Sequence, residues 1–296
     1  MRDVENTFIE RPVMKVGVDS YSYHRRFGEV YPNQVDPGER WDFERCIDET
    51  LRLGADGISL ETCFMPRFDK SYLTEIKSRL DEHSLERMVA WGHPDGLEGG
   101  KNKQAAKEMT KHLATASGVG AKVMRIVGSS LMFRDEPHGP QIEQISEILK
   151  ETVKKAEDAD VKLAIENHID FTSDEILEIL DRVDSPFLGV NFDTGNTLRV
   201  FEDPVEAARK LAARTYATHI KDIDPGTGSP RDWTFWGSAA AGSGIIDMPG
   251  IVSALAEAGY EGMLCLEIDF LKDKHADEIQ AVEDGVKYLR DLLAEM

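Results

Sequence analysis

The sequence has few cysteines and no long hydrophobic run, and each shortage argues against a class of protein. Its three cysteines, Cys46, Cys63 and Cys265, are an odd number without a CxxC spacing, so neither a disulfide framework nor a zinc ribbon is indicated. No apolar run approaches the length of a membrane span, and the first twelve residues are too polar for a signal peptide. We therefore expect a reduced, cytoplasmic protein without a membrane partner.

Positive charge is also scarce, because 35 Lys and Arg residues face 55 Asp and Glu residues, for a net charge of −20. Such a field repels the phosphate backbone of nucleic acids and anionic membranes. No cluster of Lys and Arg in the chain is long enough to form a local basic patch. Nucleic acid is therefore not an expected partner, and the acidity indicates a soluble, self-repelling surface.

Short, continuously apolar runs recur along the chain and alternate with amphipathic stretches. Continuous apolar character over so few residues is typical of strands that are covered on both faces. The runs are MKVGV from Met14, GISL from Gly57, RMVAW from Arg87, KVMRIV from Lys122, VKLAI from Val161, FLGVNF from Phe187, TYATHI from Thr215 and GMLCLEI from Gly262. Eight strand–helix units in 296 residues predict an α/β fold, a single-domain (β/α)₈ TIM barrel over residues 1–296, in which residues 1–12 form an N-terminal extension.

The segments between these runs carry helix signals. Thr172 and Glu175 fit a capping box, and Pro204 and Pro249 stand where the helices after the sixth and seventh strands begin. A doubly wound open sheet is the alternative fold, but no GxGxxG follows the first strand, which disfavours its nucleotide-binding version. Residues 224–243, rich in Gly, Pro and Trp, predict a long loop after the seventh strand that serves as a lid or substrate wall.

Four polar residues stand at the ends of the fifth to eighth predicted strands, namely Glu166, Asp193, His219 and Glu267. Because consecutive barrel strands are neighbours and chemistry sits at their carboxyl ends, we expect these side chains to converge. Three carboxylates in a half-buried mouth would repel one another, and a divalent cation removes that repulsion. The set suits Mn²⁺ first, with Mg²⁺, Co²⁺ or Zn²⁺ as further candidates. A ring of carboxylates bonded to helix N-termini is the alternative interpretation.

Further polar and aromatic residues fall on the predicted mouth of the barrel. Aromatic rings there favour a carbohydrate substrate, because the apolar faces of sugars stack on them. The candidate substrate-binding residues are Tyr23, His24, Glu61, His93, Arg125, Asn196 and Trp236, and the candidate catalytic residues are Glu166, Glu267, His168 and Lys221.

The stretches AIENH, VNFDTGN, THIKD and CLEID, in this order on strands five to eight, resemble the xylose isomerase-like TIM barrels. That superfamily includes sugar and sugar-phosphate isomerases and epimerases, inosose dehydratase, and AP endonucleases of the endonuclease IV type. The resemblance runs from about Met14 to the C-terminus. It implies that Glu166, Asp193, His219 and Glu267 bind one divalent metal, with Glu166 and Glu267 flanking the substrate as an acid/base pair.

The chain departs from this family pattern at two positions. Asn196 stands where many members have a histidine, and Thr172 stands where ketose 3-epimerases carry a further glutamate. The second departure argues against a 3-epimerase of the tagatose or psicose type. The endonuclease branch needs additional metal ligands, including histidines, of which the chain offers no clear set.

The resemblance implies a sugar isomerase or epimerase that works through a cis-enediolate. A lyase or dehydratase that eliminates from a keto sugar or a 3-keto glycoside is the first alternative, and a non-catalytic sugar-binding barrel is the second. Asp19 to Glu29 is similar to the first loop of members that act on 3-keto glucosides, including the larger subunit of bacterial C-glycoside deglycosidases. Those pair with a small β-rich subunit, so both a small partner subunit and a homo-oligomer remain open.

Overall fold

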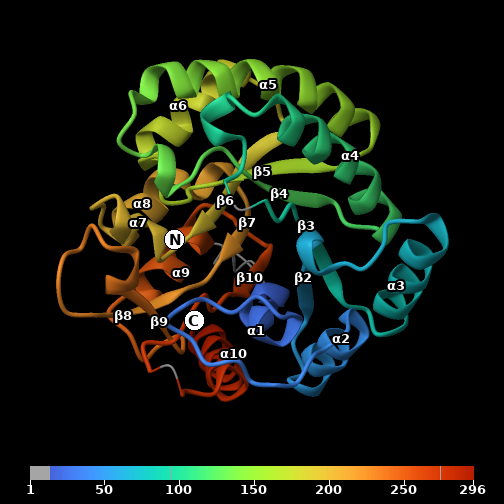
Figure 1. Ribbon diagram of the computed structural model, residues 1–296, viewed down its shortest axis with the longest axis vertical. Coiled ribbons are helices and arrows are strands. Elements are labelled where there is room, and N and C mark those ends of the chain that lie inside the picture. Colours follow the sequence, from blue (N-terminus) through green and yellow to red (C-terminus); the bar gives the residue numbers. More distant parts are fainter. Residues whose placement is uncertain (1–13, 94, 274) are drawn as a thin grey trace, which may run out of the picture.

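The structure is a computed structural model that describes residues 14–93, 95–273 and 275–296. The predicted N-terminal extension, residues 1–12, lies outside the described residues. Figure 1 shows strands at the centre of the molecule and helices around them. Eight strands form one sheet in the order β10-β1-β2-β3-β4-β5-β6-β7, and each of their pairings is parallel. The strands are β1 Lys15–Asp19, β2 Gly57–Glu61, β3 Glu86–Ala90, β4 Val123–Val127, β5 Lys162–Glu166, β6 Leu188–Asp193, β7 Thr215–His219 and β10 Met263–Leu266.

The sheet closes into a barrel just beyond the end of β7. The Ile220 amide donates to the Cys265 carbonyl at 2.7 Å, and the Glu267 amide donates to the Ile220 carbonyl at 3.1 Å. All eight predicted strands are present, and the prediction of a single-domain (β/α)₈ barrel is confirmed.

The barrel interior is filled by side chains that alternate between small and long. Met88, Ala164, Ala217, Met263 and Cys265 form a buried cluster there, on β3, β5, β7 and β10. A Cβ atom at Gly17 would lie only 2.0 Å from the Met263 sulfur, so this position on β1 needs glycine. The packed interior leaves the carboxyl ends of the strands as the place where polar side chains meet.

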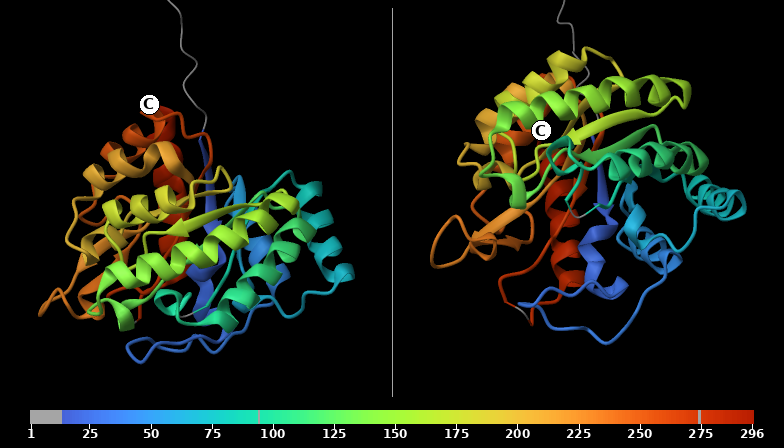
Figure 2. Two further views of the ribbon diagram at one scale, coloured as in Figure 1. Left: turned by 90° about the horizontal axis from the view of Figure 1, so that it is seen from above. Right: turned by 45° about the horizontal axis from the view of Figure 1, so that its top comes forward.

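The helices cover the outside of the barrel, and Figure 2 shows α10 running beside β1. The expected capping box is present at α6, where Thr172 accepts from the Glu175 amide and the Glu175 side chain accepts from the Thr172 amide. Pro204 and Pro249 lie in the first turns of α8 and α9, as predicted. The helices are α1 His24–Phe27, α2 Phe43–Arg52, α3 Lys70–Glu82, α4 Lys103–Val119, α5 His138–Asp158, α6 Ser173–Val183, α7 Asn196–Arg199, α8 Pro204–Leu211, α9 Met248–Glu257 and α10 Glu278–Glu295.

The segment after β7 is more regular than the long loop that the sequence predicts. Two strands, β8 Asp222–Pro225 and β9 Trp236–Ala239, pair as an antiparallel hairpin. The hairpin attaches to the barrel where the Ser238 amide donates to the Phe270 carbonyl at 2.7 Å. Gly and Pro occupy the turn between the two strands. The predicted loop is therefore found only at the tip of the hairpin, and its two sides are strands.

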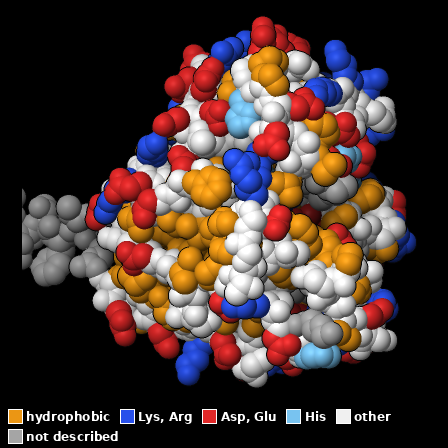
Figure 3. Space-filling view, turned by 60° about the vertical axis from the view of Figure 1, so that its left-hand side comes forward, with side chains coloured by type: hydrophobic (Ala, Val, Ile, Leu, Met, Phe, Trp, Pro, Cys, Tyr) orange, Lys and Arg blue, Asp and Glu red, His pale blue; other side chains and the backbone are white. Residues whose placement is uncertain are grey.

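The outer surface carries both signs of charge. Figure 3 shows the face on the left of Figure 1, where hydrophobic side chains gather near the middle and acidic and basic side chains surround them. The exposed large hydrophobic residues of the described chain include Phe201 and Ile245. None of the described helices is long and apolar enough to cross a membrane.

Candidate metal centre and substrate cavity

The four side chains expected to converge do meet at the mouth of the barrel. Glu166, Asp193 and His219 end β5, β6 and β7, and each offers a ligand atom within 4.8 Å of the others. Glu267 follows β10 and contacts His219 Nδ1 through its carboxylate. All four are buried, because the strand ends lie under the loops of the mouth.

Three polar atoms at this point, Asp193 Oδ2, His219 Nδ1 and Glu267 Oε2, have no hydrogen-bond partner among the described residues and are held only by ion-pair contacts with one another and with Lys221. Buried polar atoms are nearly always satisfied, and an unsatisfied one costs about 1–3 kcal/mol. A cation between these atoms would satisfy all three. Three carboxylates and one imidazole nitrogen also form a donor set that divalent metals accept, so the residues present fit a metal ion.

The remaining atoms of the candidate ligands are held by neighbouring groups. Asp193 Oδ1 accepts from the Gly195 amide at 2.9 Å and from the Asn196 amide at 2.8 Å, which leaves Oδ2 to face the centre. Glu166 Oε1 accepts from Asn196 Nδ2 at 3.0 Å, and Glu166 Oε2 accepts from Arg125 Nε. Asn196 therefore orients two of the four carboxylate and imidazole side chains.

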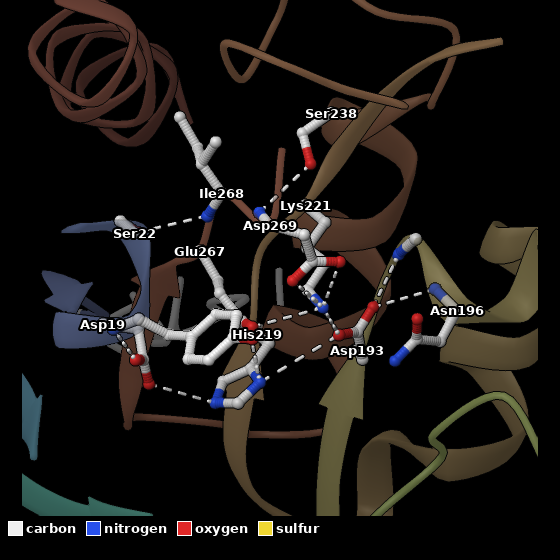
Figure 4. A network of polar contacts seen from close by, with 12 residues as sticks. Asp19, Ser22, Asp193, Asn196, His219, Lys221, Ser238, Glu267, Ile268 and Asp269 are labelled. Carbon is white, nitrogen blue, oxygen red and sulfur yellow. Dashed lines mark hydrogen bonds and ion pairs between the residues drawn. The ribbon is translucent and has the colours of Figure 1, made fainter. Parts of the chain in front are cut away.

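Asp19 lies on the far side of His219, and the sequence assigned it no role. Its Oδ2 atom is 3.4 Å from His219 Nε2, while Oδ1 accepts from the Tyr21 amide at 2.6 Å. Figure 4 shows the imidazole ring between Asp19 on one side and Asp193 and Glu267 on the other. A proton on Nε2 that points to Asp19 would leave Nδ1 free for a metal. The only sequence signal was the position of Asp19 at the end of a buried strand.

Lys221 places one positive charge among these carboxylates. Its Nζ atom is 3.1 Å from Asp193 Oδ2, 3.3 Å from Glu267 Oε1 and 3.0 Å from Asp269 Oδ1 (Figure 4). Burial disfavours the ammonium, but Asp193 and Asp269 outweigh burial and raise the pKa of Lys221 well above its usual value. Lys221 therefore stays charged and holds the carboxylates close together.

The pKa values of the cluster are displaced in opposite directions. Burial raises the pKa of Asp193 to about 7 and also raises the pKa of Glu267. Burial works against a charged His219, but Glu267 and Glu166 beside the ring raise its pKa well above the usual value. Burial likewise works against a charged Glu166, but Arg125 and then His219 hold its pKa below the usual range. Perturbed values of this kind cluster at functional sites.

A cavity of about 430 Å³ opens directly above the cluster. Its walls include most of the residues predicted to bind substrate or act on it, namely Glu61, His93, Arg125, His168, Asn196, Lys221 and Glu267. Burial lowers the pKa of His168 to about 4, so its imidazole is neutral at physiological pH. The volume lies in the range of small-molecule sites.

Three predicted substrate-binding residues do not reach this cavity. Tyr23 is fully buried in the core against Trp41, His24 bonds Gln34 Oε1 at 3.0 Å behind the wall, and Trp236 donates to the Pro230 carbonyl at 2.8 Å. The cavity wall therefore does not include these three predicted side chains. Tyr23 ends the 3-10 turn after β1, His24 begins α1, and Trp236 begins β9 of the hairpin.

Other aromatic side chains take their place in the cavity wall. Tyr21 and Trp233 line it, together with Tyr31, whose ring lies 5.3 Å from the ring of Trp233. Arg199 and Asp269 also line it and form a wide ion pair at 3.9 Å. Sequence reasoning missed Tyr31 and Arg199, although Arg199 stands one helical turn after Asn196.

Fold and site together define a closed parallel barrel with a buried donor set for a metal at the carboxyl ends of its strands. The chain belongs to the xylose isomerase-like TIM barrel family, whose model matches residues 47–292. The resemblance in the sequence is thereby confirmed.

Individual relatives are identical to this chain at about a sixth to a quarter of the aligned residues. It is 22% identical over 211 residues to the 3-oxo-isoapionate decarboxylase of Pectobacterium atrosepticum, covering 71% of this chain and 69% of the relative. It is 25% identical over 287 residues to the inosose dehydratase of Clostridium botulinum, covering 89% and 94%. The solved structure of the IolI protein with a bound zinc atom superposes with a TM-score of 0.74 at 17% identity, covering 95% of this chain and 99% of that one.

Proposed function

We propose that this protein is a metal-dependent enzyme that moves a proton from the carbon next to the carbonyl group of a keto or aldo sugar, as an isomerase or epimerase. The observation that carries the proposal is the convergence of Glu166, Asp193, His219 and Glu267, with atoms left unsatisfied, beneath an open cavity. The family and the enzymatic names of its relatives support it.

The metal ion would be held by Glu166, Asp193, His219 and Glu267. A divalent ion bound there supplies a Lewis acid that stabilises negative charge on the oxygens of the substrate. We propose Mn²⁺ first, because carboxylate oxygens dominate the set, and Mg²⁺, Co²⁺ or Zn²⁺ as alternatives. The zinc atom named in the IolI structure supports a divalent ion without deciding among these.

The side chains of this protein divide the remaining work. Glu267 lines the cavity and is placed to take the proton from carbon, while Lys221 holds it in position. His168 also lines the cavity in a neutral form and is a second candidate base. The Glu166 side chain does not line the cavity, so we propose it as a ligand only.

The charges of the cavity favour a neutral, non-phosphorylated sugar. Lys221 faces three carboxylates, Arg125 faces Glu166 and Glu61, and Arg199 faces Asp269. No cation that lines the described part of the cavity is left without an acidic neighbour to bind a phosphate group. The rings of Tyr21, Tyr31 and Trp233 offer surfaces for the apolar face of a sugar.

A lyase or dehydratase is the second candidate function. The same cluster could start an elimination from a keto sugar or a 3-keto glycoside, since the first step is again proton removal from carbon. The name of the inosose dehydratase relative supports this alternative. A sugar-binding barrel without catalysis is disfavoured, because all four ligand positions are filled. A homo-oligomer or a small partner subunit, and a cytoplasmic location, remain predictions.

The test is incubation of the metal-loaded protein with a panel of keto sugars and 3-keto glycosides in D₂O. We expect solvent deuterium at the carbon next to the carbonyl in at least one product, and loss of that incorporation in Glu267→Gln. A new double bond or a released leaving group would favour the lyase. Bound metal without deuterium incorporation into any compound would contradict an enzymatic role.

A further inference from the structure

Glu61 differs from the other acidic side chains that line the cavity. Asp269 bonds Lys221 through both oxygens at 3.0 and 3.1 Å, and Glu267 contacts Lys221 and His219. Glu29 is exposed at the outer edge, where it accepts from Tyr21 Oη at 3.2 Å. Glu61 is buried, and its carboxyl group lies 3.7 Å from Arg125 Nη1 and 3.9 Å from Cys63 Sγ.

The space for this carboxyl is built into the adjoining strand end. A Cβ atom at Gly92, directly after Trp91 at the end of β3, would lie 2.6 Å from Glu61 Oε2 and 2.7 Å from Cys63 Sγ. The Gly92 amide donates to Thr62 Oγ1 at 2.9 Å, which fixes the two strand ends relative to each other. Any side chain at Gly92 would displace the Glu61 carboxyl from the cavity wall.

Arg125 separates Glu61 from the metal centre. Its Nε atom binds Glu166, and its Nη1 atom faces Glu61. The same guanidinium group therefore holds Glu166 among the metal ligands and Glu61 in the cavity wall. A reaction that removes a proton and returns it at another position or face needs two proton-transfer groups. Glu267 lines the cavity and can serve as one, whereas Glu166 does not line it.

We propose that Glu61 is the second proton-transfer group, the acid that returns a proton to the carbon skeleton of the sugar. This inference rests on the proposed function. The Glu267 carboxylate takes the proton from the carbon next to the carbonyl, the C–H electron pair becomes a C=C bond, and the carbonyl π pair moves onto oxygen. The O–H bond of Glu61 then breaks, its proton forms a new C–H bond, and the carbonyl group is restored. Glu267 ends protonated and Glu61 ionised, and exchange with water through the open cavity restores both.

The surroundings of Glu61 keep a proton available at neutral pH. Burial raises the pKa of Glu61 to about 8, and Arg125 only partly opposes the rise. The charged groups that face it from other strands are Asp19 and Glu267, which raise the pKa further, and His219, which lowers it. Placing a carboxyl group in apolar surroundings is an established way to keep it protonated, and so able to donate a proton, near neutral pH.

The test compares deuterium in recovered substrate with deuterium in product for the metal-loaded protein in D₂O. In Glu61→Gln we expect Glu267 still to exchange the proton of the substrate, while product formation falls on the order of 10²-fold or more. The alkaline fall of kcat/KM that reflects ionisation of Glu61 should also disappear. Glu61→Asp keeps an acid, so it should retain the alkaline limb with a lower kcat, and it serves equally if Glu61→Gln does not fold.

Asp170→Asn is the matched control. Asp170 is 2% exposed, as Glu61 is, and burial raises its pKa to about 8 as well, but it does not line the cavity. This variant should keep the wild-type ratio of product to exchange. Product formation by Glu61→Gln within a few-fold of wild type, or an equal loss of exchange and product, would overturn the role of Glu61. A wild-type protein that binds no metal, or that exchanges no sugar proton, would instead contradict the proposed function.

Discussion

At the scale of single residues, the candidate ligands could be predicted because each ends a strand. In a closed barrel, the position of a residue in its strand determines where its side chain points. The meeting of Glu166, Asp193 and His219 can therefore be predicted without knowledge of the loops. Tyr23 and Trp236 could not be placed in this way. Each adjoins a 3-10 turn, and which side of such a turn faces the cavity depends on packing against distant residues.

The carboxylate behind His219 gives the first residue-scale prediction. Asp19→Asn removes the acceptor that favours a proton on Nε2, so the ring presents Nδ1 less well to a metal. We expect divalent-metal affinity to fall about 10- to 100-fold, measured by competition with a fluorescent chelator. Asp170→Asn, which removes a buried carboxyl that accepts from the Phe171 amide, should bind metal as wild type does. Equal affinities in all three proteins would refute the orienting role of Asp19.

The proton on His219 gives the second residue-scale prediction. The neighbouring Glu267 and Glu166 raise its pKa despite burial, so the metal-free ring is protonated at neutral pH. A metal at Nδ1 must displace that proton, and affinity should therefore increase with pH. Calorimetry in buffers of different ionisation enthalpy should detect release of at least one proton per metal, to which Asp193 and Glu267 add because their pKa values are also raised. Metal binding without proton release would show that His219 is not a ligand.

The buried carboxyl group of Asp170 gives the third residue-scale prediction. Burial raises its pKa from 3.8 to about 8, so the folded state holds a proton that the unfolded state releases. This contribution to stability is complete below pH 4 and is lost as pH rises toward 8. Metal-free Asp170→Asn should therefore gain stability relative to wild type between pH 5 and 8, measured by urea unfolding. Exposed Asp158→Asn should follow the wild-type slope, and a parallel course for Asp170→Asn would contradict the prediction.

At the scale of elements, the helices and barrel strands could be predicted and the hairpin could not. Apolar runs, proline positions and the capping box at Thr172 identify the βα units, because each signal lies within the element itself. The β8–β9 pairing joins Asp222 to Ala239 across a tip rich in Gly and Pro. The Gly and Pro residues of the tip predict a loop, whereas the strand pairing depends on contacts between residues up to seventeen positions apart, which the local sequence does not reveal.

Asp222 anchors the hairpin to the segment before α9, and this gives the element-scale prediction. Its carboxylate accepts from the amides of Gly242, Gly244 and Ile246 at 2.9, 2.8 and 3.1 Å. Asp222→Ala leaves these donors without an acceptor, and we expect a loss of roughly 3 kcal/mol in the free energy of unfolding. Half-buried Asp224→Ala, which breaks only a pair with Lys272, should change it by less than about 1 kcal/mol. Similar losses in both variants would contradict the anchoring role.

At the scale of the whole molecule, composition predicted a charged surface, and the eight strand–helix units predicted the barrel. The net charge of −20 is spread over a surface that carries both signs (Figure 3). The chemistry depends instead on a few side chains at one end of the barrel, where the cations Arg125, Arg199 and Lys221 partly balance a larger number of carboxylates. Composition cannot reveal that balance, because it results from the meeting of six strand ends.

The central claim is that Glu166, Asp193, His219 and Glu267 hold one divalent metal ion. Elemental analysis of the purified full-length protein after dialysis against trace metal tests it most directly. We predict about one divalent ion per chain in the wild type and in Asp170→Asn, and loss of that ion in Asp193→Asn, since Asp193 Oδ2 faces the centre without a hydrogen bond. A wild-type protein without metal, or an Asp193→Asn variant that keeps it, would contradict the account.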